Sequence, residues 1–176
     1  METKDFTLHR DGVDGDFDVT LYGTAGRPVI VFPEGDSSCS SWEDGGMIDA
    51  LAGLINAGRV RLFCVDSADG SSWYAGYAPT EYRLASLGGY FDLVENDLAQ
   101  LVREEAPGAG APLVAGAGIG ALNATIAMLR KPSLYGFSRS RVPMMPRGSL
   151  VTLCPMVGVP SRPWTRCAAC VTIRCW

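Results

Sequence analysis

Residues 112–124, PLVAGAGIGALNA, decide the fold of this 176-residue chain. The run PLVAGA is apolar and typical of a buried strand, a glycine turn follows it, and the small residues after the turn favour a helix. The turn has three interpretations: a glycine loop that binds a nucleotide, an enzyme's nucleophile turn that has lost its serine, or a tight turn with no further role. Position 118, at its centre, is Gly118.

Strands and helices alternate along residues 1–136. Apolar β-branched runs predict buried strands, alternation of polar and apolar residues predicts an antiparallel first strand, and helical spacing of apolar residues predicts helices. The expected strands cover residues 17–23, 28–33, 60–67 and 111–117, and the expected helices cover 47–58, 90–108 and 120–132. This order predicts an α/β fold with a parallel sheet and helices on both faces. Ligands bind beyond the carboxyl ends of such strands, so the loops after Pro33, Asp66 and Ala115 form the candidate site.

The charge distribution divides the chain near residue 136. All 19 acidic residues lie between Glu2 and Glu105, so residues 1–136, with nine Lys and Arg, carry a formal charge of −10. Residues 137–176 hold six Arg and no acid, four of the six Cys and five of the eleven Pro, and show no helical periodicity. We therefore expect a partial α/β domain over 1–136 and an irregular Arg/Pro/Cys-rich tail over 137–176.

Composition limits the cellular setting. Hydrophobic residues make up 47% of the chain, yet none of its apolar runs approaches the ~18 residues that span a bilayer. The acidic N-terminal stretch lacks the apolar segment of a secretory signal. The sequence predicts a cytoplasmic protein with reduced cysteines and no membrane partner.

The nucleotide-binding interpretation rests on Gly116, Gly118 and Ala121, which fit G-x-G-x-x-A between a strand and a helix. Glycines there let a pyrophosphate approach the helix N-terminus. The pattern also needs an acidic residue ~20 positions later to hold the ribose, and no acid follows Glu105. Arg139 could replace it for a 2′-phosphate, but no strand precedes Arg139. A nucleotide-binding oxidoreductase stays an alternative, and no cofactor is expected.

The lost-nucleophile interpretation rests on residues 116–120, GAGIG, which match G-x-S-x-G except at position 118. Small flanking residues let a strained strand-to-helix turn pass close to its neighbours, and glycine at the centre tolerates the strained angles better than serine. The turn could survive the loss of the serine, whereas the nucleophilic chemistry could not.

Three stretches carry a resemblance to a known family: VIVFPEG, GGMIDALAGLINAGRVRLFCVDSADGSSWY and VAGAGIGALNATIAMLRKPSLYG. They resemble esterases of the α/β-hydrolase superfamily related to esterase D, feruloyl esterases and mycolyltransferases. The resemblance covers roughly residues 17–136, and the long second stretch is its most specific part. It implies a partial α/β-hydrolase fold and an ester hydrolase ancestry.

The resemblance assigns roles residue by residue. Gly118 takes the nucleophile position, the Ile119 amide is one oxyanion donor, and the amide of Glu34 or Gly35 is the other. Asp66, Ser67 and Trp73 line the pocket, although Asp66 could instead cap the turn that follows it.

The resemblance also implies an acid and a histidine after the nucleophile, whereas no acid follows Glu105 and the only histidine is His9. We expect a truncated, catalytically inactive homologue that binds at most a small ester or acyl ligand. A noncatalytic binding or scaffold protein that reuses the pocket is the alternative.

Other reactive residues favour simpler interpretations. Cys167-x-x-Cys170 with Cys175 and Cys154 could ligate zinc or form a redox pair, but the paired spacing of strong zinc motifs is absent, and no metal is expected. Without a basic scaffold with interleaved aromatics, the six tail arginines predict no nucleic-acid partner. Cys39 is expected to be a plain thiol and His9 a solvated residue.

A sheet that ends at residues 111–117 would expose one strand edge. Exposed edges pair with other chains, so self-association through this edge is expected.

The tail generates a prediction at the level of the gene. Acids and Lys vanish, and Arg, Pro and Cys rise, at the same place where periodicity and the family resemblance stop. GC-rich codons read in a shifted frame give such a composition, so we hypothesise a frameshift near codon 136. Translating the other two frames of the nucleotide sequence should then restore a strand, an acid and a histidine over about a hundred residues. If neither frame does so, the tail is an authentic extension.

Overall fold

The computed structural model describes residues 1–10 and 15–135. The predicted tail 137–176, with Arg139 and four cysteines, lies outside the described residues. A five-stranded sheet has the order β1-β2-β4-β3-β5. The strands are β1 (Thr3–Leu8), β2 (Phe17–Tyr22), β3 (Arg27–Phe32), β4 (Val60–Val65) and β5 (Leu113–Gly116). The helices are α1 (Ser41–Asp44), α2 (Met47–Asn56), α3 (Thr80–Leu93), the π-helix η1 (Val94–Leu98), α4 (Ala99–Glu105) and α5 (Ile119–Arg130).

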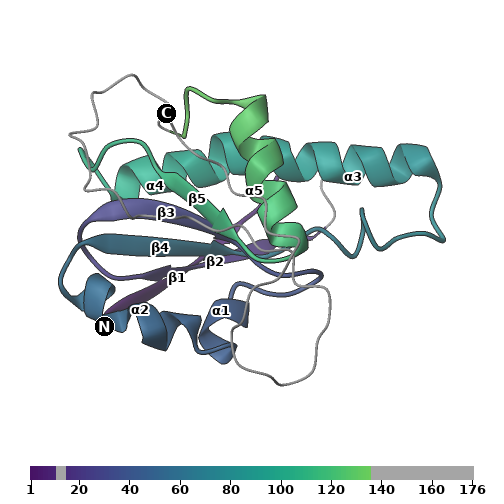
Figure 1. Ribbon diagram of the computed structural model, residues 1–176. Coiled ribbons are helices and arrows are strands. Elements are labelled where there is room, and N and C mark those ends of the chain that lie inside the picture. The colour runs from purple at the N-terminus through teal and green to yellow at the C-terminus, as the bar shows by residue number, and fades with distance from the viewer. Residues whose placement is uncertain (11–14, 136–176) are drawn as a thin grey trace, which may run out of the picture. The chain divides into compact units, whose positions relative to one another are not determined.

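The sheet is mixed. β3 pairs in parallel with β4 and β5, whereas β2 pairs antiparallel with both β1 and β4. β3 and β4 are apolar on both faces because helices cover both: α1 and α2 lie on one face, and α3, α4 and α5 on the other (Figure 1). The predicted α/β class is confirmed, with two antiparallel strands added to the parallel part.

The larger core lies between the sheet and α3, η1 and α5. Its centre is an aromatic group in which the Tyr90 ring lies 5.5 Å from Phe17, 6.5 Å from Phe32 and 5.7 Å from Phe91. These separations are typical of tilted and edge-to-face ring pairs. The group joins β2, β3 and α3 into one packed unit.

Three elements differ from the sequence-based expectation, and one of them is the short helix α1 in the loop after β3. The helix expected over 90–108 begins ten residues earlier, at Thr80, directly after Pro79, and contains the π-helix η1. Gly88 and Gly89 weaken the helical pattern there, and packing against the sheet overrides their low propensity. Strand β1 was not expected, because none of its residues is fully buried.

β5 stands at the end of the strand order, so its outer edge has no partner strand within the described residues. Leu113 in this strand is 41% exposed. Self-association through this edge stays a prediction. No helix in the described part of the chain is long and apolar enough to cross a membrane.

The start of α5 meets the end of β3 backbone to backbone. A Cβ atom at Gly120 would lie 2.2 Å from the carbonyl oxygen of Pro33, and one at Gly116 would lie 2.4 Å from the carbonyl carbon of Gly120. Neither carbonyl belongs to a flexible side chain, so neither contact can relax cheaply. Both positions require glycine for close approach.

We expect Gly120→Ala to lower the free energy of unfolding by about 3 kcal/mol, because the added methyl group overlaps main-chain atoms. Gly53→Ala is the matched control: it lies in α2 with no atom within 4 Å of the added Cβ, so stability should rise by up to ~1 kcal/mol. Urea unfolding followed by circular dichroism measures both. Equal effects of the two substitutions would contradict the close approach.

Candidate functional site

The turn between β5 and α5, called the elbow from here on, is the one to which the resemblance assigns a nucleophile. Gly118 has φ 54° and ψ −123°, a combination that residues with side chains rarely adopt. The amide of Gly120 donates to the Ala117 oxygen over 2.8 Å, and that of Ala121 donates to the Gly118 oxygen over 3.2 Å. The chain therefore reverses within three residues and presents position 118 at the amino end of α5.

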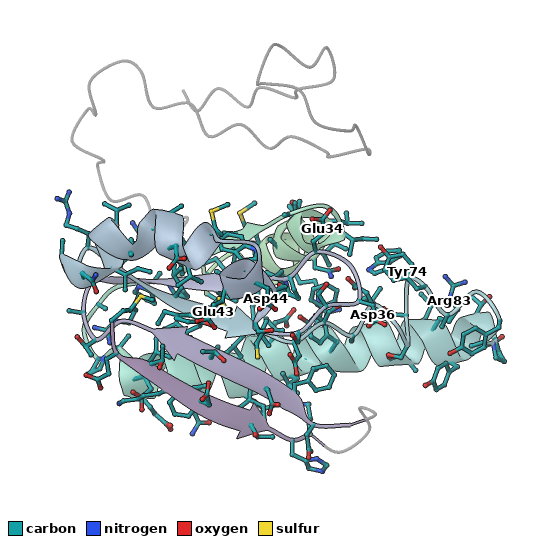
Figure 2. The ribbon with its side chains drawn as sticks, turned by 90° about the horizontal axis from the view of Figure 1, so that it is seen from below. Glu34, Asp36, Glu43, Asp44, Tyr74 and Arg83 are labelled. Atoms are coloured by element: carbon teal, nitrogen blue, oxygen red, sulfur yellow. The ribbon has the colours of Figure 1, made fainter. Side chains whose placement is uncertain are left out.

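The loop after β3 lies against this turn. A Cβ atom at Gly118 would lie 2.9 Å from Oε1 and 3.0 Å from Cγ of Glu34. The structure thus brings the Glu34 side chain beside Gly118, whereas the donor roles of the amides of Ile119 and of Glu34 or Gly35 stay predictions. Figure 2 shows Glu34 beside α5. The sequence assigns a role to the backbone amide of Glu34 and none to its side chain, which lies beside Gly118.

Tyr74 is a second residue that the sequence did not single out. Its hydroxyl would lie 3.3 Å from a Cβ atom at Gly35, and the side chain is 56% exposed. Figure 2 shows Tyr74 on the same side of the molecule as Glu34. Arg83 fixes this segment by donating from Nε to the Ser72 oxygen over 2.8 Å and from Nη2 to the Trp73 oxygen over 3.2 Å.

Asp66, at the carboxyl end of β4, connects strand β2 and the loop after β3. Its Oδ2 accepts the Asp18 amide over 2.9 Å, and its Oδ1 accepts the Cys39 amide over 2.7 Å. Neither amide belongs to the turn after Asp66, so the turn-capping role stays a prediction. Asp66 also lines a cavity of about 340 Å³ together with Ser67.

The 340 Å³ cavity does not reach the elbow. Its polar lining comes from the loops after β3 and β4 and from the residue before β2: Asp16, Asp36, Ser37, Ser38, Asp66, Ser67 and Ser71. The lining includes neither Gly118 nor Glu34 nor Trp73. A second cavity of about 420 Å³ lies at the amino end of β5, away from the elbow. The residues predicted to line one pocket are therefore divided: Asp66 and Ser67 line the cavity of about 340 Å³, whereas Trp73 does not.

A buried polar chain connects α5 to the loop after β4. The Trp73 Nε1 donates to Asn123 Oδ1 over 3.1 Å, and Asn123 Nδ2 donates to Asp69 Oδ1 over 2.9 Å. Asp69 is 1% exposed, and its Oδ2 is buried without a hydrogen-bond partner in the structure. Burial raises the pKa of the Asp69 carboxyl, because the charged form loses its hydration. Trp73 thus faces α5 through this chain of bonds.

Cys39 and His9 match their simpler interpretations. Burial, and to a lesser degree the charge of Asp66, raises the pKa of the Cys39 thiol, which disfavours the reactive thiolate. His9 Nδ1 lies 2.9 Å from Asp16 Oδ1 on an exposed surface. His9 follows β1, which is separated from β5 by four strand spacings, ~19 Å at about 4.8 Å each. Within the described residues, no group of three or more His, Cys, Asp or Glu could hold a metal ion.

Asp69 generates a prediction about pH. Since its folded-state pKa is raised, its stabilising contribution is complete below the unfolded-state pKa and is lost as pH rises through the folded-state value. Asp69→Asn should therefore flatten the decline in unfolding free energy as the pH rises above about 4, the ordinary pKa of an aspartate. Urea titrations across that range measure it, with Asp49→Asn on α2 as the exposed control. An unchanged slope for Asp69→Asn would contradict the assignment.

Comparison with known proteins places this geometry among solved folds. No family model matches the sequence, and no curated protein matches it. MPT51 of Mycobacterium tuberculosis matches with a TM-score of 0.56 at 13% identity over 77% of this chain and 49% of that one. The enterobactin esterase of Shigella flexneri matches with a TM-score of 0.54 at 18% identity over 77% and 35%. A ferulic acid esterase matches with a TM-score of 0.54 at 14% identity over 76% and 55%.

The chain spans between 35% and 55% of the length of these three structures. The similarity covers 76–77% of this chain. The chain therefore has the α/β-hydrolase fold, and the solved structures that it resembles include esterases.

Proposed function

We propose that this chain is an esterase-type α/β-hydrolase homologue that binds a small ester or acyl ligand at the elbow without hydrolysing it. The observation that carries the proposal is the backbone of Gly118, at φ 54° and ψ −123° between β5 and α5. This geometry belongs to a nucleophile elbow, and Gly118 offers no side chain to act as the nucleophile.

Ester hydrolysis at such an elbow requires three acts. A serine oxygen attacks the carbonyl carbon, a histidine accepts the serine proton and later returns it to the leaving alcohol, and an acid orients the histidine. Gly118 supplies no oxygen, no acid follows Glu105 in the sequence, and the only histidine, His9, follows the far strand of the sheet. Residues 1–176 therefore supply no serine at position 118 and no acid or histidine after it.

The binding half of the mechanism has its parts in place. The first amides of a helix lack partners within the helix, and no side chain caps the N-terminus of α5, so the Ile119 amide is suited to a carbonyl oxygen. The amide of Glu34 or Gly35 is the second donor that the resemblance implies. A neutral carbonyl ligand could be held there without bond breaking.

The nucleotide-binding alternative has less support. A pyrophosphate would occupy the amino end of α5, where the Glu34 carboxylate lies against Gly118. Like charges would oppose each other there. A noncatalytic scaffold role and the cytoplasmic location remain compatible with the proposal.

The test is ester hydrolysis by the chain as it stands. We expect p-nitrophenyl acetate hydrolysis no faster than with heat-denatured protein, and no labelling by a fluorophosphonate serine probe. Gly118→Ser should not restore ordinary rates, because no histidine can take the proton.

Ile119→Pro supplies the control, since it deletes one oxyanion amide and leaves the surface otherwise intact. Turnover by the unchanged chain that Ile119→Pro abolishes would refute the proposal, because it would place live chemistry at the elbow.

A further inference from the structure

The space beside Gly118 is filled from another element. On the side where an L-residue would carry its side chain, the nearest atoms are Oε1, Cγ and Cδ of Glu34, at 2.9, 3.0 and 3.2 Å from the Cβ position. Real Cβ atoms essentially never approach other atoms below 3.0 Å. A side chain at position 118 therefore meets the Glu34 side chain, which must shift to admit it.

Among the described residues, Glu34 is held by a hydrogen bond to its backbone and by none to its carboxylate. Ser37 Oγ donates to the Glu34 carbonyl oxygen over 2.6 Å, which fixes the loop after β3. The side chain is exposed, so it can rotate into solvent without breaking a buried contact. The partial positive charge at the amino end of α5 favours the carboxylate in its observed place.

We propose that Glu34 closes the elbow: its side chain occupies the volume of the absent nucleophile, and a group reaches position 118 only when Glu34 rotates away. This inference rests on the proposed function, because it concerns the same turn. It identifies Glu34 as a positioning residue that controls access, in addition to the amide donor that the resemblance implies.

The test introduces a thiol at the turn. Gly118→Cys is prepared alone and with Glu34→Ala, Glu34→Gln or Asp49→Ala, and the rate of alkylation by iodoacetamide is followed peptide by peptide with mass spectrometry. Cys39 in the same molecule is the internal reference. Removing the Glu34 side chain should accelerate alkylation at position 118 about tenfold, because a thiol at a helix N-terminus is reactive once uncovered.

The other variants separate volume from charge. Glu34→Gln keeps the volume and removes the charge, so it should accelerate alkylation much less than Glu34→Ala. Asp49→Ala removes the same charge from α2 and should leave the rate unchanged. Equal rates for Glu34→Gln and Glu34→Ala, or a rate that ignores Glu34 altogether, would overturn the closure.

A stability measurement decides the question even where the thiol variant folds poorly. Gly118→Ala should lower Tm in the unchanged chain and lower it clearly less when combined with Glu34→Ala, since the crowding is then gone. The same loss of Tm in both backgrounds would overturn the proposal. Rapid alkylation in every background would refute closure while leaving the elbow assignment intact, whereas ester turnover by the unchanged chain would refute the proposed function alone.

Discussion

The close approach of α5 to the end of β3 is the constraint on which the rest of the structure depends. Because Gly120 has no side chain, α5 packs directly against the carbonyl oxygens of Phe32 and Pro33. This contact sets the tilt of α5 and therefore where its other residues lie. Arg130, at the far end of the helix, reaches Asp92 Oδ1 over 2.9 Å and Glu95 over 2.5 Å, which ties α5 to α3 and η1.

The same placement explains the buried acid. Asn123 lies one turn into α5 and meets Asp69 only because the helix begins where it does. Burying the Asp69 carboxyl group costs free energy. The Asn123 side-chain amide offsets part of this cost by donating to Oδ1, and the raised pKa means that burial favours the neutral carboxyl group. The gain is a fixed connection between the elbow helix and the loop after β4, which includes Trp73.

Local sequence pattern predicted the parts of the fold that local pattern controls. The runs at 28–33 and 60–67 and the glycine turn at 116–120 were placed correctly, because buried strands and tight turns depend on residue type at adjacent positions. The exposed strand β1 has no such signature. The beginning of α3 was missed because its glycines are tolerated only through packing. The contact between the Glu34 side chain and Gly118 joins residues far apart in the chain, and sequence periodicity gives no information about such contacts.

Glycine at position 118 is also the residue that the fold alone would favour. A residue with a side chain held near φ 54° and ψ −123° costs about 1–3 kcal/mol of strain, and an active hydrolase offsets that cost by the chemistry of its nucleophile. In the noncatalytic function that we propose, this chain gains nothing from such strain. Glycine at position 118 avoids this strain and leaves space for the Glu34 side chain. Gly116 and Gly120, on either side of it, are required by the packing of the backbone. The shape of an elbow and the chemistry of an elbow therefore depend on different residues, and the shape can persist by itself.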